Sequence, residues 1–171
     1  EPHRALGLSF FNATAREGGR IESAGIEYLG AVRVGMLKPL LQAFSPGAGD
    51  PSYSDVYARI SHQDVGGFRL SGNFLWARDE LGISARTRGE SAQIDSRSRY
   101  AWLRADKDWS RQLASSLWIG HSRIDSVRFG EVDDPGFARG MVNDSRASQF
   151  WDFRGQLRWH PRPSHWFETG F

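Results

Sequence analysis

The sequence predicts an all-β fold, an antiparallel up-and-down transmembrane β-barrel segment of about eight strands. The clearest indication is residues 149–160, where apolar and polar side chains alternate. Successive side chains of a strand point to opposite faces of the sheet, so this segment would have two unlike faces. A membrane barrel strand has this pattern because one face meets lipid and the other a wet lumen. One face would carry Trp151, Phe153, Gly155, Leu157 and Trp159, and the other Phe150, Asp152, Arg154, Gln156, Arg158 and His160.

Composition is the second indication. Only 39% of the 171 residues are hydrophobic, and no apolar run approaches the roughly 20 residues of a transmembrane helix. Barrels look this polar because only every second residue faces lipid. Aromatic residues make up 13% of the chain and include seven Trp, which fits aromatic girdles at the membrane interfaces. The length suits one domain, so residues 1–171 are predicted to form a single partial barrel domain.

The strand pattern recurs along the whole chain. In the first segment the facing is ambiguous, because Leu6, Leu8 and Phe10 compete with Phe11 and Ala13 for the apolar face. The last segment stops after about seven residues, short of the roughly 9–11 that span a bilayer, so we expect a truncated barrel rather than a closed one. In chain order, the predicted strands lie near residues 5–16, 22–36, 53–63, 68–79, 98–109, 113–128, 148–160 and 165–171.

The middle segments repeat the two-faced pattern with different clarity. Residues 22–36 alternate from Ile26 to Val34, and residues 68–79 are as regular as 149–160. Residues 98–109 oppose Ala101, Leu103 and Ala105 to Tyr100, Trp102, Arg104 and Asp106, while 113–128 are the least regular. We predict that the side chains facing lipid include Phe68, Leu70, Phe74, Val56, Ile60, Phe153 and Leu157.

The connections alternate in predicted length. Residues 64–67, 110–112 and 161–164 have the Gly, Pro, Asp and Ser content of tight turns. Between them lie polar stretches near 37–52, 80–98 and 130–147, which are predicted to be long loops. Outer-membrane barrels have this asymmetry, with short periplasmic turns and longer extracellular loops.

Several other classes of function are disfavoured by the residues. The net charge is +2, and the arginines are interleaved with Asp and Glu rather than clustered, so no nucleic-acid partner is predicted. Cysteine is absent, and the histidines are scattered, so we predict no metal site and no cofactor. Neighbouring Ser61 and His62 would face opposite ways on a strand, and no other set converges for nucleophilic catalysis, so we predict no enzyme.

Four segments carry a resemblance to a known family: residues 5–19, 27–33, 51–61 and 99–110. Together they resemble the early barrel strands of TonB-dependent outer-membrane receptors. The resemblance implies a bacterial outer-membrane protein with a barrel of about 22 strands around an N-terminal plug domain. It also implies that a periplasmic TonB complex pulls on that plug to import a scarce small ligand, such as an iron chelate, cobalamin or a glycan. Residues 33–38 depart from the run of residues that we would expect in the family at this point.

The face opposite the lipid supplies the candidate ligand-binding residues. Arginines on that face can hold anionic ligand groups through bidentate contacts, or can pair with acids across strands and with the plug. The acids on the same face would be Glu27, Asp79, Asp106 and Asp152. The predicted loops at 80–97 and 130–147 are further candidate regions for ligand contact. The candidate ligand-binding arginines are Arg33, Arg59, Arg69, Arg104, Arg154 and Arg158.

Two alternative functions stay open at this point. The chain could be a complete small eight-strand outer-membrane protein with a structural or adhesive role. It could also be a soluble β-protein that binds a small ligand, although a soluble barrel would fill its interior with apolar side chains rather than arginines.

Overall fold

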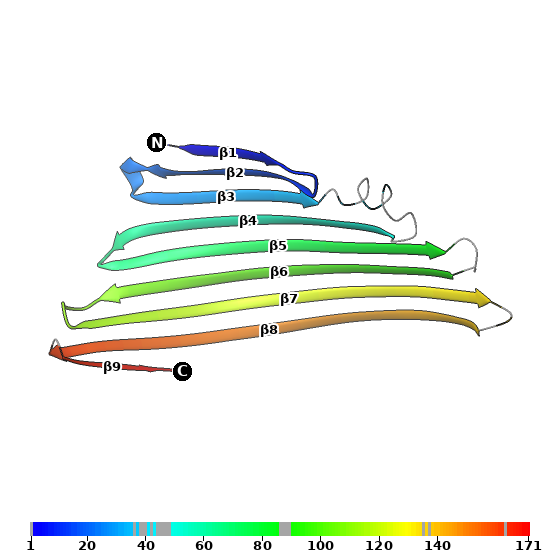
Figure 1. Cartoon of the computed structure of the whole chain (residues 1–171). Helices are drawn as coiled ribbons and strands as arrows, with labels where there is room; N and C mark the ends of the chain where they lie inside the picture. The colour runs from blue at the N-terminus through cyan, green and yellow to red at the C-terminus, as the bar shows by residue number, and fades with distance from the viewer. Residues whose placement is uncertain are drawn as a thin grey trace.

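The computed structural model of the chain describes residues 2–35, 37, 41, 43, 49–85, 90–134, 136, 138–162 and 164–171. Most of these residues form one antiparallel sheet, with a short 3-10 turn, η1 (Glu22–Ala24), between two of its strands (Figure 1). Residues 37, 41 and 43 have a helical backbone. The strands are β1 (His3–Leu8), β2 (Asn12–Ile21), β3 (Ile26–Gly35), β4 (Asp50–Val65), β5 (Phe68–Ala85), β6 (Glu90–Asp108), β7 (Leu113–Asp134), β8 (Ala138–Arg162) and β9 (His165–Gly170).

Each strand pairs with its neighbours along the chain, in the order β1 to β9. The prediction of an all-β, antiparallel, up-and-down fold is therefore confirmed. The prediction of about eight strands is wrong by one, since the structure has nine in its described part. The sheet is open, because β1 and β9 form its two edges and lie at opposite ends of the layer (Figure 1).

The extra strand comes from residues 5–16, which were predicted to be one strand and form the β1–β2 hairpin. The Ser9 amide donates to the Asn12 carbonyl at 2.9 Å, and Ser9 Oγ accepts from the amides of Phe11 and Asn12 at 3.2 and 3.0 Å. A serine that bonds nearby amides favours a turn over a continuous strand. The hairpin also explains the ambiguous facing, because Leu8 pairs with Ala13 on one face.

The predicted loops at 80–98 and 130–147 are also corrected, because most of these residues are strand. β5 and β6 pair as far as Ala85 with Glu90, and β7 and β8 as far as Asp134 with Ala138. Polar residues are compatible with an antiparallel strand whose backbone groups are bonded to neighbours, since its faces can both be wet. The predicted loop at 37–52 lies largely outside the described residues, and β4 begins at Asp50.

Short turns connect the strands at one end of the sheet, as predicted for 64–67 and 110–112. Between β4 and β5, Gly66 and Gly67 have φ values of 62° and 81°, which favour glycine, and Asp64 Oδ1 accepts from the Gly67 amide at 2.9 Å. Between β6 and β7, Ser110 Oγ accepts from the Leu113 amide at 3.1 Å. In the predicted turn 161–164, Pro161 and Arg162 belong to β8 instead.

The register divides the side chains between two faces. We call the face that carries Trp151, Phe153 and Leu157 the Trp151 face, and the face that carries Arg154 and Arg158 the Arg154 face. Following the pairs across the sheet puts Phe153, Ile119, Leu103, Gly72, Ile60 and Tyr28 in one row of the Trp151 face. All seven side chains predicted to meet lipid lie on the Trp151 face.

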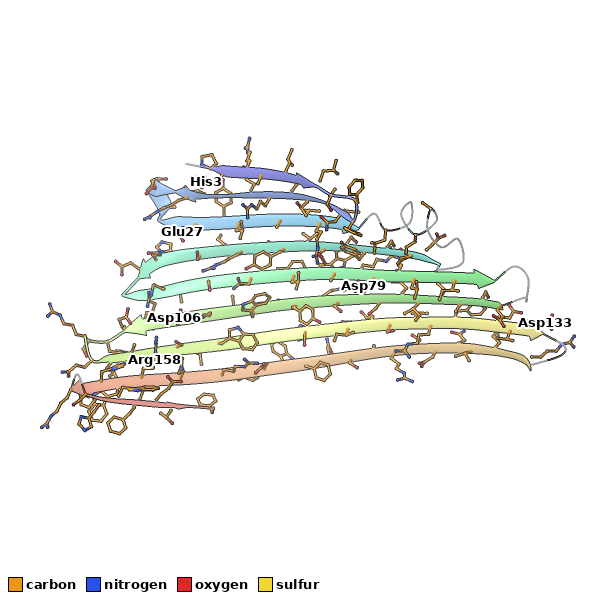
Figure 2. All side chains as sticks on the ribbon, viewed as in Figure 1. His3, Glu27, Asp79, Asp106, Asp133 and Arg158 are labelled. Carbon is orange, nitrogen blue, oxygen red and sulfur yellow. The ribbon has the colours of Figure 1, made fainter. Side chains whose placement is uncertain are left out.

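The sheet is a single layer, and side chains project from both of its sides (Figure 2). Among the described residues, no hydrophobic side chain is buried, so the molecule has no conventional core in this part of the chain. Leu103, Trp151 and Phe153 on the Trp151 face are each more than half exposed. Within the described residues, no helix has the length and the apolar character to cross a membrane.

Cross-linking tests the β1–β2 hairpin, and the chain has no native cysteine to interfere. Leu6 pairs with Ala15, so Leu6→Cys with Ala15→Cys should form a disulfide, because paired Cα atoms lie about 4.5–5.5 Å apart. Leu6→Cys with Ile21→Cys is the control and should stay reduced. Gel mobility without reductant measures both. Continuous strand through residues 5–16 would separate positions 6 and 15 by about 30 Å and prevent the bond.

Candidate ligand-binding site on the Arg154 face

All six arginines predicted to bind ligand lie on the Arg154 face. The acids Glu27, Asp79, Asp106 and Asp152 share this face with them. Their cross-strand partners are Asp55 for Arg33, Asn73 for Arg59, Asp106 for Arg69, Trp118 for Arg104 and Arg154, and Glu168 for Arg158. The sequence therefore placed these side chains on the correct face, and ligand binding by them stays a prediction.

Four of the arginines line one hollow of about 440 Å³, which we call the four-arginine hollow. They come from β4, β5, β6 and β8, near the end of the sheet with the short turns. Two carboxylates, Glu27 and Asp106, also line it, so the lining carries more positive than negative charge. Its other polar lining residues are Ser61, His62, Gln63 and Ser71. The four arginines are Arg59, Arg69, Arg104 and Arg158.

Ion pairing divides these four arginines into two kinds. Arg69 Nη2 donates to Asp108 at 3.0 Å, and Arg104 Nε donates to Asp106 at 3.0 Å. For Arg59 and Arg158, no carboxylate of the described residues lies within 4.0 Å, and both side chains are exposed. A guanidinium has five donors in a planar fork that matches carboxylate and phosphate groups. Arg59 and Arg158 are therefore the candidate contacts for an anionic ligand.

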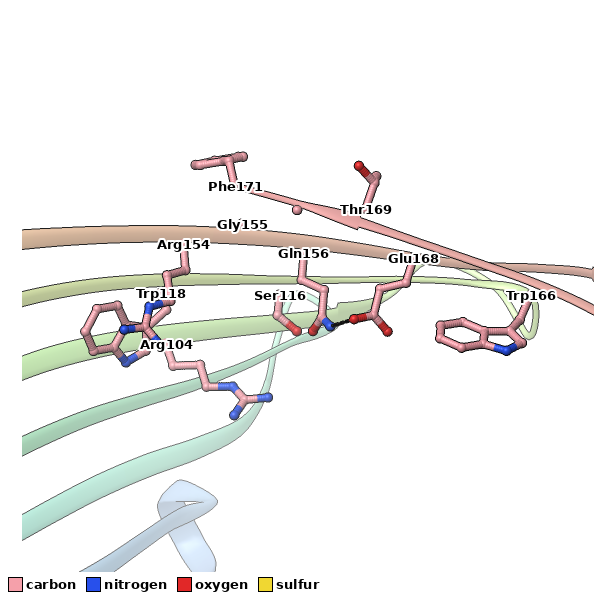
Figure 3. Close-up of a pocket in the computed structure, with 11 residues that line it drawn as sticks. Arg104, Ser116, Trp118, Arg154, Gly155, Gln156, Trp166, Glu168, Thr169 and Phe171 are labelled. Carbon is pink, nitrogen blue, oxygen red and sulfur yellow. Dashed lines mark hydrogen bonds between the residues drawn. The ribbon is translucent and has the colours of Figure 1, made fainter.

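A second hollow of about 720 Å³ adjoins the first, because Arg104 lines both (Figure 3). Arg154 donates to Asp152 at 2.8 Å and lies 5.0 Å from the centroid of the Trp118 ring. The Trp118 indole covers Gly120. A Cβ atom added at residue 120 would approach a ring carbon of Trp118 to 2.3 Å, so this position of the indole requires glycine at residue 120. Figure 3 shows Gln156 Nε2 donating to Glu168, at 2.6 Å.

Arg33 and the predicted ligand loops lie apart from these hollows. Arg33 pairs with Asp55 and lies 5.2 Å from the centroid of the Tyr53 ring, so its charge is neutralised locally. Residues 80–97 and 130–147 are mainly strand, so the prediction of loops there is wrong, and ligand contact by these residues stays a prediction.

Sequence reasoning missed the aromatic part of the site. Trp118 lines the second hollow, and Tyr57 and Trp102 lie with their ring centroids 6.3 Å apart on the same face. Tyr57 Oη donates to Asn73 Oδ1 at 2.9 Å. The sequence does contain an indication of this part of the site. Trp102 and Trp118 are aromatic residues at positions of the alternating pattern that are otherwise polar.

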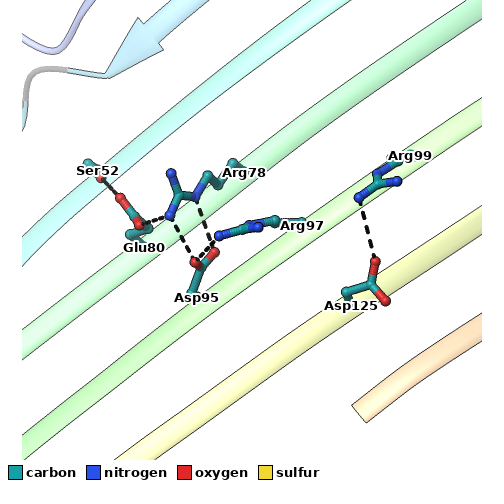
Figure 4. Close-up of polar contacts among 7 residues, drawn as sticks. All are labelled: Ser52, Arg78, Glu80, Asp95, Arg97, Arg99 and Asp125. Atoms are coloured by element: carbon teal, nitrogen blue, oxygen red, sulfur yellow. Dashed lines mark hydrogen bonds and ion pairs between the residues drawn. The ribbon is translucent and has the colours of Figure 1, made fainter. Parts of the chain in front are cut away.

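A separate set of charged side chains lies on the Trp151 face, and Figure 4 shows most of them. We call this set the charged rows, and it consists of Arg78, Glu80, Asp95, Arg97, Arg99, Arg123 and Asp125. Asp95 accepts hydrogen bonds from Arg78 at 2.9 Å and from Arg97 at 2.8 Å. The hydrogen bond from Arg78 is the main cause that lowers the pKa of Asp95 from 3.8 to about 2. Its ionised form therefore stabilises the fold fully above about pH 4, and this contribution is lost as the pH falls toward 2.

The excess of arginine over carboxylate in the four-arginine hollow is compatible with the binding of an anionic group. Among the described residues, no group of three or more His, Asp or Glu is placed to hold a metal ion. No protein-family model matches the chain, and no curated protein matches it.

Pyrophosphate binding tests the four-arginine hollow. Arg59→Gln with Arg158→Gln should weaken pyrophosphate binding about tenfold or more, because each charge-assisted hydrogen bond contributes about 1.5–3 kcal/mol. Arg16→Gln with Arg128→Gln removes the same charge elsewhere on this face and should have little effect. Isothermal titration of the detergent-solubilised chain measures both. Equal weakening in the two double variants would mean that only net charge matters.

Proposed function

We propose that the chain is part of the wall of a TonB-dependent outer-membrane receptor, which imports a small ligand bearing anionic groups. The observation that carries the proposal is an apolar band that crosses the Trp151 face and ends abruptly. In β5 the band contains Phe68, Leu70 and Phe74 and ends at Trp76. In β8 it extends from Trp159 to Trp151.

The length of the apolar band suits a bilayer. Phe68 to Trp76 and Trp159 to Trp151 each span eight residues, about 27 Å at ~3.4 Å per residue. A strand tilt of about 40° reduces this to roughly 20 Å along the membrane normal, close to the apolar height of about 25 Å in known barrels. The strands themselves continue well beyond Trp76 and Trp151, so the band is shorter than the strands that carry it.

Aromatic side chains line both limits of the apolar band. At the short-turn end, Phe68 lies 6.3 Å from Trp109, and Trp159 lies 5.6 Å from Phe167, measured between ring centroids. Trp76 and Trp151 lie at the opposite limit. Aromatic rings settle at membrane interfaces because they are amphipathic, so two such rows favour a membrane-spanning band.

The absence of a buried core in the described residues supports a membrane setting as well. An open single-layer sheet in water leaves its apolar face exposed and its edge strands unpaired, which favours aggregation. Lipid would cover the Trp151 face, and further barrel strands of a longer chain would pair with β1 and β9. A soluble β-protein lacks this account of the exposed face, and a complete small barrel would need a pairing between β1 and β9 that the open sheet does not have.

The receptor class follows from the resemblance, together with the lumen that the Arg154 face would line. In a wide barrel, the four-arginine hollow would face a plug domain and the ligand path. Arg59 and Arg158 would meet anionic groups of the ligand or the plug. The plug, the TonB contact and the remaining strands would belong to regions outside these 171 residues.

Arginine substitutions on the two faces test the membrane setting. Leu70→Arg or Leu157→Arg should cost about 2–4 kcal/mol of barrel stability, because a charge on the lipid face loses its hydration. The neighbouring changes Ser71→Arg and Gln156→Arg should cost little, because they lie on the Arg154 face. Denaturant unfolding from lipid vesicles measures all four variants. Similar costs on both faces would contradict a lipid-facing Trp151 face.

Fluorescence quenching tests the two aromatic rows. In variants that retain one Trp, Trp151 and Trp76 should be quenched from one interface, and Trp159 and Trp109 from the other, since the rows lie at opposite limits of the band. Lipids brominated at different acyl depths give the depth of each indole, and an aqueous quencher added outside the vesicles gives its side. Trp151 and Trp159 at the same interface, or either one at the bilayer centre, would overturn the proposed topology.

A further inference from the structure

The Trp151 face changes from apolar to charged at the limit marked by Trp76. In the row of Trp76, the paired residues on the next two strands are Arg99 and Arg123. One row further from the apolar band lie Arg78, Arg97 and Asp125, and one row beyond them lie Glu80 and Asp95. The arginines are therefore nearest the band, and the carboxylates lie on average further from it.

This layering belongs to one face of the sheet. The row one residue beyond Trp76 along the strands belongs to the Arg154 face, and it contains Ala77, Ser98 and Ile124. Beyond it on β5 and β6 lie Leu81, Ile83 and Ile94, which share the Arg154 face. Beyond the band, the described residues of β5 and β6 carry no arginine on the Arg154 face, whereas β7 and β8 carry Arg128 and Arg146 there, so the cluster of four arginines is specific to the Trp151 face.

The charged rows retain free hydrogen-bonding capacity. Four guanidinium groups share three carboxylates. Asp95 bonds Arg78 and Arg97, Glu80 bonds Arg78, and Asp125 lies 4.0 Å from Arg99 (Figure 4). Asp125 also lies 3.1 Å from Arg123. Arg99 and Arg123 each expose about half of the side chain, at 51% and 46%. A guanidinium group carries five N–H donors, so most donors of Arg99 and Arg123 stay available for hydrogen bonds to a ligand.

We propose that Arg99 and Arg123, with Arg78 and Arg97 beside them, bind the headgroup phosphates of anionic lipid at the outer rim of the barrel. This inference rests on the proposed membrane setting. Strands lie about 4.8 Å apart, so the four arginines of β5, β6 and β7 cover a patch about 10 Å wide, the size of one or two lipid headgroups. Short turns mark the periplasmic side of barrels, so the patch would face the outer leaflet.

The position of the patch favours lipid over a dissolved anion or a protein. Arg99 and Arg123 are in the row of Trp76, where the acyl chains would end and the phosphates would begin. Arginine binds phosphate bidentately, and each basic residue near an anionic membrane surface contributes about 1 kcal/mol. The carboxylates further out pair with the guanidinium groups within a strand and between neighbouring strands, and they would lie away from the phosphates.

Lipid selectivity in vesicles tests this inference. The chain is reconstituted in phosphatidylcholine, and the immobilised fraction of spin-labelled phosphatidylglycerol is compared with that of spin-labelled phosphatidylcholine. Preference for phosphatidylglycerol is expected, and Arg99→Gln with Arg123→Gln should reduce it by about fivefold for each arginine removed at the occupied sites. Arg128→Gln with Arg146→Gln is the matched control. It also removes two positive charges from nearby parts of β7 and β8, but from the Arg154 face instead of the Trp151 face. The control should keep the preference.

The outcomes separate this inference from the proposed function. If neither spin label is immobilised, the chain is not in the bilayer and the membrane proposal fails. If phosphatidylcholine is immobilised but phosphatidylglycerol is not preferred, or if both double variants lose the preference equally, only the lipid site is overturned. Loss of the preference on adding millimolar inorganic phosphate, at constant ionic strength, would overturn a lipid site in favour of a dissolved phosphate.

Discussion

The antiparallel hydrogen-bond ladder is the interaction on which the rest of this structure depends. Every strand bonds only to its neighbours along the chain, and the described residues bury no hydrophobic side chain that could organise the sheet in another way. Such a ladder satisfies the interior backbone groups without help from water, and only the edges β1 and β9 keep a free row. A sheet held in this manner can place an apolar face against lipid, because lipid offers no partner to an unbonded amide or carbonyl.

Once the register is set by the ladder, the composition of each row decides what the sheet can contact. The Trp151 face is mainly apolar between two aromatic rows and charged beyond Trp76. The Arg154 face is charged near the short turns and becomes partly apolar around Leu81 and Ile83 on β5. A half-buried soluble strand would keep one face apolar along its whole length. The reversal on continuous strands favours a molecule whose surroundings change from lipid to water along the strand direction.

Ion pairing then separates arginines that organise the sheet from arginines that are available to a partner. Arg104 and Arg154 pair with Asp106 and Asp152 two residues away on their own strands, whereas Arg59 and Arg158 project into the four-arginine hollow without a described carboxylate within 4.0 Å. Exposed pairs of this kind contribute little to stability, about 0–1 kcal/mol each. Their main effect is to orient side chains, and a small number of guanidinium groups are left without a carboxylate within 4.0 Å among the described residues.

The sequence by itself determined which side chains share a face, because a period of two is a property of any strand and needs no knowledge of its partners. Residues 149–160 and 68–79, and the face of all six candidate arginines, could be predicted for this reason. Only the tertiary structure decided where strands begin and end and which residues lie side by side. Ser9 divides the first predicted strand through local hydrogen bonds, and residues 80–85 and 90–98 become strand because each has a bonded neighbour. The lining of one hollow by both Arg59 and Arg158, and the placement of Arg99 and Arg123 in the row of Trp76, depend on cross-strand register, which is set by pairing between distant segments.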